Sequence, residues 1–155
     1  TVTYENVELA ELVDEELSNF IYLMEERGLS VSVSGECSVN TDKKMMKSLI
    51  DNLLSNAVKY AAEKSEIRVV IKDKGAAGLD TPVQGRGITI TNKISKPIEK
   101  TAEEIVKPYV KGDNSRGSRQ GSGVGLAIVE NVARKLKYKV NYEITEKEFK
   151  VGVKM

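Results

Sequence analysis

The chain has 155 residues, of which 40% are hydrophobic and 30% charged, a balance that is ordinary for a soluble globular protein with one sizeable core. Its 24 basic and 23 acidic residues give a net charge of +1, which argues against a nucleic-acid-binding face, and no apolar run approaches the length of a membrane span. Histidine is absent, which excludes histidine-based metal sites and catalytic triads, and the lone Cys37 excludes an internal disulfide.

The first third of the chain predicts a helix, a strand and the start of a second helix. Apolar residues recur at helical spacing over residues 9–24, and Gly28 follows as a stop signal. The alternation across Leu29–Val39 predicts one strand, in which Cys37 is a small buried residue. A long helix follows, capped by Thr41 or Asn40.

This long helix, which we expect to run to about Ala62, has an unusual polar stripe. At roughly 100° per residue, Asn52, Asn56 and Lys59 share one narrow face. Apolar residues cover the other side, namely Met46, Ile50, Leu53, Leu54, Ala57, Val58 and Ala61. Amide oxygens can bind a hard cation, and a lysine can bind the phosphate group that accompanies such a cation. The alternative is the solvated face of an ordinary amphipathic helix.

The middle of the chain predicts two short strands and two long loops. Residues 67–71 and 88–90 are rich in β-formers, and a Gly- and Pro-containing loop without assignable chemistry joins them over residues 72–86. Residues 93–120 are long, polar and marked by glycines, which is unusual inside a compact domain unless the segment is a functional lid.

Three alternating glycines then lead directly into a helical pattern. Gly121, Gly123 and Gly125 can let backbone N–H groups approach an anion, and the helix N-terminus adds unpaired donors. Neither common phosphate motif fits: no Gly-Lys-Ser/Thr follows, and Leu126 stands where a dinucleotide fingerprint has its third glycine. The glycines therefore predict either a phosphate-binding loop or a flexible joint.

The last segments, Lys139–Ile144 and Phe149–Val153, predict a closing hairpin. The order of all the elements predicts an α/β fold, a two-layer sandwich with helices on one face of a mixed sheet.

Several of these segments, in this order, resemble one known family. Residues 52–60 are similar to an asparagine box, residues 107–116 to an aromatic box with a basic ATP lid, and residues 121–128 to a second glycine box. Residues 4–13 resemble the usual beginning of the same domain. The chain thus resembles, over nearly its whole length, the catalytic ATP-binding domain of bacterial sensor histidine kinases. This domain has the Bergerat-type fold shared with gyrase, MutL and the Hsp90 chaperones.

The resemblance implies ATP and Mg²⁺ as ligands and assigns roles on the long helix. Asn56 is the implied Mg²⁺ ligand through its amide oxygen. Asn52 occupies the turn where hydrolytic relatives carry a water-activating glutamate, so a kinase is implied rather than an efficient ATPase. Lys59 is expected to contact phosphate, and Tyr60 to border the ribose or base, unless Tyr60 only packs in the core.

The resemblance also implies roles for residues of the lid and of the glycine loop. Lys111 and Arg116 are the implied catalytic residues, which would neutralise the γ-phosphate during transfer. The second glycine box, with Gly121, Gly123, Gly125 and Leu126, is expected to border the bound nucleotide.

One box departs from the family pattern. The aspartate that accepts a hydrogen bond from the adenine amino group falls on Asn92, and no glycines follow in residues 93–96. An asparagine oxygen can still accept that bond, but without charge assistance.

The missing histidine implies that the phosphoacceptor lies on a separate dimerisation domain, upstream of this chain in the family. We expect residues 1–155 to be one catalytic domain, monomeric in isolation, from the cytoplasmic part of a membrane-anchored kinase. Its partners would be ATP, the dimerisation domain and, indirectly, a response regulator, with no nucleic acid. Two alternatives remain: a degenerate, pseudokinase-like nucleotide-binding module, and a serine kinase of the anti-sigma-factor type.

Overall fold

The computed structural model describes residues 1–73, 85–95 and 124–155. The elements in chain order are β1 (Glu5–Glu8), α1 (Leu9–Leu17), a 3₁₀ turn (Ser18–Phe20), α2 (Ile21–Arg27), β2 (Ser30–Ser34), β3 (Ser38–Thr41), α3 (Lys43–Tyr60), β4 (Glu66–Lys72), β5 (Gly87–Lys93), α6 (Val124–Leu136), β6 (Lys139–Ile144) and β7 (Glu148–Lys154). None of the helices in this part of the chain is both long enough and apolar enough to cross a membrane.

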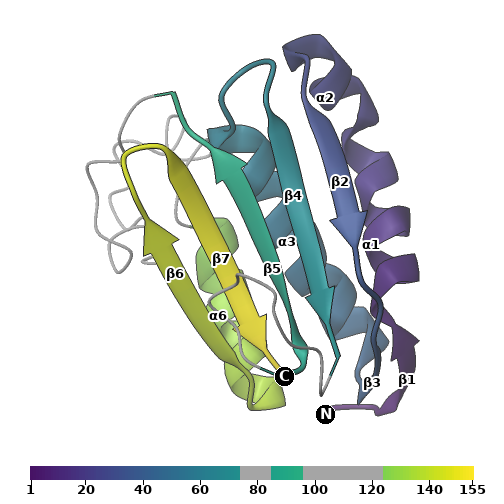
Figure 1. The fold of residues 1–155 in the computed structure, drawn as a ribbon. Coiled ribbons are helices and arrows are strands. Elements are labelled where there is room, and N and C mark those ends of the chain that lie inside the picture. Colours follow the sequence, from purple (N-terminus) through teal and green to yellow (C-terminus); the bar gives the residue numbers. More distant parts are fainter. Residues whose placement is uncertain (74–84, 96–123) are drawn as a thin grey trace, which may run out of the picture.

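Five strands form one mixed sheet in the order β2-β4-β5-β7-β6. Strands β2 and β4 are parallel, and the other neighbours are antiparallel. The helices lie together on one face of this sheet, with α3 between α1 and α6 (Figure 1). Strands β1 and β3 form a separate antiparallel pair. The predicted two-layer α/β sandwich is therefore confirmed.

The core lies between the sheet and α3 because strand residues alternate between the two faces of a sheet. The apolar positions of the central strands are almost completely buried: Ile67, Val69, Ile71, Ile88, Ile90, Phe149, Val151 and Val153. The predicted apolar side of α3 packs against them and is buried throughout. Burial at this extent contributes about 1.5–3 kcal/mol for each large side chain.

The single strand predicted over Leu29–Val39 is wrong, because the structure has β2 and β3 there, in different sheets. The chain turns between them at Gly35, whose φ is +85°. A Cβ at Gly35 would lie 1.8 Å from the carbonyl oxygen of Ile71, so only glycine fits against β4. Cys37 is buried as expected, but it lies in the turn and not in a strand.

The helix boundaries differ in detail from the prediction. The first predicted helix is divided into α1 and α2 by the 3₁₀ turn, and Gly28 ends α2 in the left-handed conformation (φ +69°), as its stop signal indicated. The predicted caps Thr41 and Asn40 are wrong, since both belong to β3. The N-cap of α3 is Asp42, whose side chain accepts from the Met45 N–H.

Candidate functional site

The polar stripe of α3 exists as predicted. Asn52 and Asn56 are partly buried and Lys59 is exposed, while the residues between them are mostly in the core. The amide nitrogen of Asn52 donates to the carbonyl oxygen of Ser48 at 2.7 Å, so its amide oxygen is the atom left to accept from a ligand. Asn56 makes no side-chain hydrogen bond to any described residue, so both its amide oxygen and its amide nitrogen can face a ligand.

Two aromatic rings border the C-terminal end of this stripe. The rings of Tyr60 and Phe149 pack edge to face, with centroids 6.0 Å apart and an interplanar angle of 71°. The ammonium of Lys59 lies 5.5 Å from the centroid of the Tyr60 ring. Burial raises the pKa of the Tyr60 phenol above its ordinary value of 10.0, so this hydroxyl is a hydrogen-bond donor at neutral pH.

Asn92 lies on β5 directly opposite Phe149 on β7 and is 1% exposed. Directly paired residues project from the same face of a sheet, so Asn92 is on the helix-covered side with Phe149. Its amide nitrogen donates to the Lys93 carbonyl oxygen at 3.3 Å. The amide oxygen is therefore the atom that can accept a bond from an adenine amino group.

A backbone hydrogen bond holds these residues together. The N–H of Ala62, just after α3, donates to the carbonyl oxygen of Lys93 at 2.7 Å. This contact fixes the end of α3 to the end of β5. Tyr60, Phe149 and Asn92 consequently form one wall, which joins the polar stripe of α3 to the sheet.

The glycine loop leads into α6, which begins at Val124 as the sequence predicted and packs against α3. Gly125 lies in the first turn of α6, and Leu126 is buried in the core. Unpaired N–H groups at a helix start favour an anion. Gly121, Gly123, Lys111 and Arg116 lie outside the described residues, as does the predicted lid beyond residue 95.

Phe149 is the site residue that sequence analysis missed, since it was predicted only as the start of a strand. No local pattern identifies it, because Phe149 reaches Asn92 and Tyr60 only through strand pairing and packing.

The donor set fits a magnesium nucleotide. Mg²⁺ keeps several waters and needs one or two protein oxygens besides phosphate, which the amide oxygens of Asn56 and Asn52 can supply. In the described ranges, no group of three or more acidic, cysteine or histidine side chains is placed to hold a metal.

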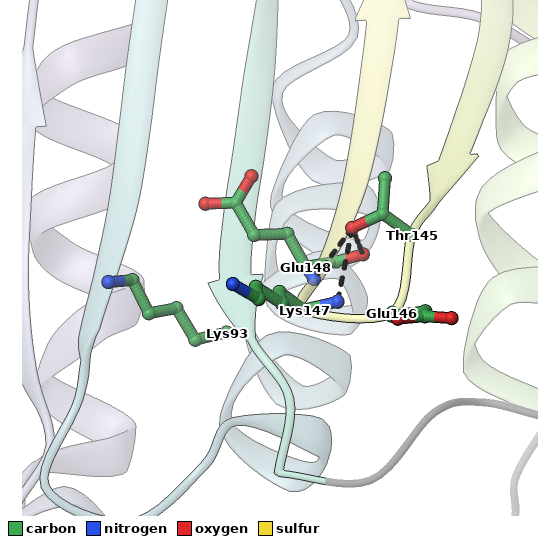
Figure 2. A pocket seen from close by; sticks show the side chains of 5 residues that line it. All are labelled: Lys93, Thr145, Glu146, Lys147 and Glu148. Carbon is green, nitrogen blue, oxygen red and sulfur yellow. Dashed lines mark hydrogen bonds between the residues drawn. The ribbon is translucent and has the colours of Figure 1, made fainter.

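A different cavity lies at the other side of the sheet. It has a volume of about 510 Å³ and is lined by Lys93, Thr145, Glu146, Lys147 and Glu148 (Figure 2). The Thr145 hydroxyl accepts from the N–H groups of Lys147 and Glu148 at 3.2 and 3.0 Å, which orders the turn between β6 and β7. Lys93 and Glu148 alternate with the buried Asn92 and Phe149, so this cavity is separate from the polar stripe of α3.

Comparison with known families and proteins agrees with the fold and with the motifs. Residues 41–154 match the family described as histidine kinase-, DNA gyrase B- and HSP90-like ATPase. The sensor histidine kinase HprS of Escherichia coli is 28% identical over 132 residues, which are 85% of this chain and 27% of HprS. The sensor protein CzcS of Cupriavidus metallidurans is 35% identical over 115 residues, 73% of this chain and 22% of CzcS. The chain thus spans about a quarter of the length of these relatives.

Solved structures show the same fold. The mycobacterial sensor histidine kinase MprB superposes with a TM-score of 0.72 at 18% identity, covering 97% of this chain and 95% of that one. A catalytic domain of the histidine kinase ThkA gives a TM-score of 0.73 at 19% identity, with the same coverage of 97% and 95%.

Proposed function

The chain belongs to the histidine kinase-, DNA gyrase B- and HSP90-like ATPase family, and from this premise we propose that it is the catalytic ATP-binding domain of a sensor histidine kinase. The proposed reaction transfers the γ-phosphate of ATP to a histidine on a separate dimerisation domain. The names of its relatives support the kinase branch of the family, since HprS and MprB are both sensor histidine kinases.

One observation carries the proposal. The polar stripe of α3 ends at the wall formed by Tyr60, Phe149 and Asn92. In this wall the side chain of Asn92 is a buried hydrogen-bond acceptor. A nucleotide needs an acceptor for its base, a ring edge for its sugar and hard oxygen ligands for the cation on its phosphates. The wall and the stripe together offer all three.

The roles follow from these positions. The amide oxygen of Asn92 accepts from the adenine amino group, and Tyr60 borders the ribose or base. Lys59 binds a phosphate, and the first turn of α6, which includes Gly125, supplies N–H donors to the phosphates. Asn56, with Asn52 one turn away, holds Mg²⁺, which neutralises charge on the phosphates when bound.

Phosphoryl transfer requires an acceptor from outside this chain, which has no histidine. Asn52 is neutral and cannot act as a base toward water, so bound ATP is kept for transfer. Lys111 and Arg116 stay assigned to stabilising the transferring phosphoryl group. The phosphohistidine would then serve a response regulator.

The proposal also gives the setting of the domain. Residues 1–155 act as one catalytic domain, monomeric in isolation, on the cytoplasmic side of a membrane-anchored kinase, where ATP is available.

Calorimetric titration with ATP, with and without Mg²⁺, tests the nucleotide site. We expect measurable binding that strengthens with Mg²⁺. Binding without any transfer to a histidine-bearing domain would favour the pseudokinase-like module. Transfer to a serine of a protein substrate would favour the anti-sigma-factor type of kinase.

A further inference from the structure

Helix α2 exposes three consecutive apolar residues that the core does not use. Tyr22 is 88% exposed, Ile21 50% and Leu23 45%. The inner side of the same helix is already occupied, since Met24 is buried and Phe20 packs partly against the core. Figure 1 places α1 and α2 at the edge of the molecule beside β2, on the opposite side of α3 from α6. The exposed residues therefore have no role in the core or in the nucleotide site.

Carboxylates lie beside two of these apolar residues, Ile21 and Tyr22. The exposed acidic residues of the two helices are Glu11, Asp14, Glu15, Glu25 and Glu26. At 100° per residue they lie within about 120° of helix surface, and Tyr22 is near the middle of that arc. The 3₁₀ turn rotates the later residues by roughly a further 60°, which still leaves Tyr22 beside the carboxylates.

No cation of these helices neutralises that surface. Arg27 is the only basic residue in the first 29 positions. Its guanidinium donates to the backbone carbonyl oxygens of Val58 and Ala61, at the end of α3. Lys43, at the start of α3, lies near two of these carboxylates, since it lines one pocket with Glu11 and Glu15. The outer side of α1 and α2 nevertheless combines an exposed aromatic residue with an excess of negative charge.

We propose that this α1–α2 surface (Glu11, Asp14, Glu15, Ile21, Tyr22, Glu25 and Glu26) is a docking surface for a basic amphipathic helix of a partner protein. Apolar residues of the partner helix would pack against Ile21 and Tyr22, while its lysines or arginines would meet the carboxylates and the face of the Tyr22 ring. Charge complementarity selects this occupant. A second copy bound by the same surface would bring like charges together, and an anionic membrane would be repelled for the same reason.

The test uses the whole chain and a synthetic amphipathic peptide of leucine and lysine as the probe. Binding is measured by calorimetry and mapped by backbone amide shifts. We expect saturable binding with shifts concentrated on residues 11–27, weakening strongly as salt is raised from about 0.05 to about 0.5 M. A peptide of the same composition in shuffled order, and one with glutamate in place of lysine, should bind far more weakly.

Variants then decide whether the surface itself is responsible. Tyr22→Ala should weaken peptide binding about fivefold or more, and Glu25→Lys should weaken it and reduce its salt dependence. Tyr4→Ala is the matched control, because Tyr4 is also exposed, at 60%, but lies outside the surface. Thermal melting of each variant verifies that it is folded.

Three results would overturn the proposal. The first is equal peptide affinity in Tyr22→Ala, Glu25→Lys and the parent, or shifts located elsewhere. The second is concentration-dependent self-association that Tyr22→Ala abolishes, which would assign the surface to a second copy. The third is binding to anionic phospholipid vesicles through residues 21–23, which would assign it to a membrane.

Discussion

Asn52 and Asn56 are one turn apart on α3 but have different surroundings. The side-chain amide nitrogen of Asn52 already donates a hydrogen bond to the Ser48 carbonyl oxygen. The Asn56 side chain makes no such hydrogen bond to a described residue. The family resemblance implies Asn56 as the metal ligand, and the absence of a bond from its side chain to a described residue is compatible with that proposal.

We predict that Asn56→Ala weakens Mg²⁺-dependent ATP binding about tenfold or more and leaves the fold intact. Alanine is a better helix former than asparagine, so the melting temperature should not fall. Calorimetry with Mg²⁺ and with a chelator measures the effect. Ser55→Ala, an exposed position on the same helix at the border of the stripe, is the control. Parent-like affinity for Mg-ATP in Asn56→Ala would show that the ligand assignment is wrong.

The second residue-scale prediction concerns Asn92→Asp. A carboxylate would give the adenine amino group a charge-assisted bond, and we expect ATP binding to strengthen by about 1 kcal/mol. The position is 1% exposed, so burial would raise the pKa of the new carboxyl. The folded state would then bind more protons than the unfolded state, and stability would be retained at acidic pH and lost as pH rises.

Calorimetry and denaturation at acidic and neutral pH measure the two effects of Asn92→Asp separately. Asn92→Ala is the companion variant, which should weaken ATP binding without the pH-dependent loss of stability. Unchanged or weaker ATP binding by Asn92→Asp, in a protein that is still folded, would contradict the adenine assignment.

At the scale of elements, α3 depends on a contact that joins its start to the N-terminus of the chain. The carboxylate of Asp42 accepts from the N–H groups of Thr3 at 2.8 Å and Met45 at 3.0 Å. These two donors lower the pKa of Asp42 below its ordinary value of 3.8. One side chain thus caps α3 and fixes the segment before β1.

We predict that Asp42→Ala lowers the melting temperature by a few degrees at neutral pH. Because the pKa of Asp42 is lower in the folded state, its stabilising effect is present above 3.8 and is lost as pH falls through the folded value. The difference between the variant and the parent should therefore shrink in acid. Asp42→Asn keeps a hydrogen-bond acceptor at the cap, so its melting temperature should fall less than that of Asp42→Ala. Melting curves across pH would contradict the argument if the difference stayed constant.

Element boundaries also show where local sequence patterns were insufficient. Alternation correctly predicted β-structure in residues 29–39, but the division into β2 and β3 depends on the close approach of Gly35 to the Ile71 carbonyl. That contact joins residues distant in sequence. The cap was missed although its signal is local, because Asp42 directly precedes the helix and its side chain accepts from the Met45 N–H.

At the scale of the whole molecule, the order of helices and strands was enough to predict the layers and the helix-covered face. The polar stripe was also predictable, since it depends only on the 3.6-residue period of one helix. The wall of Tyr60, Phe149 and Asn92 could not be predicted from local patterns. Its members come from α3, β7 and β5, and they meet only through packing and strand register. The roles of Lys111, Arg116, Gly121 and Gly123 remain predictions.

The last prediction concerns the reaction of the whole molecule. With no histidine in the chain and a neutral residue at Asn52, the isolated protein should bind ATP, form no phosphohistidine and hydrolyse ATP only very slowly. A separate histidine-bearing dimerisation domain should restore transfer in trans, weakly, because the high effective concentration given by a covalent linker is absent. Mixing the two proteins with radiolabelled ATP measures this transfer.

Variants of the same assay separate binding from transfer. Lys111→Ala and Arg116→Ala should reduce labelling of the histidine domain more than they reduce ATP affinity, because a group that acts on the transferring phosphoryl contributes mainly in the transition state. Asn56→Ala should instead reduce ATP affinity and labelling of the histidine domain together, because its proposed role is in nucleotide binding, before transfer. If ATP binds normally to the parent chain and the histidine fragment of its own kinase stays unlabelled, the amide stripe and aromatic wall serve a nucleotide-binding module that signals without transferring phosphate.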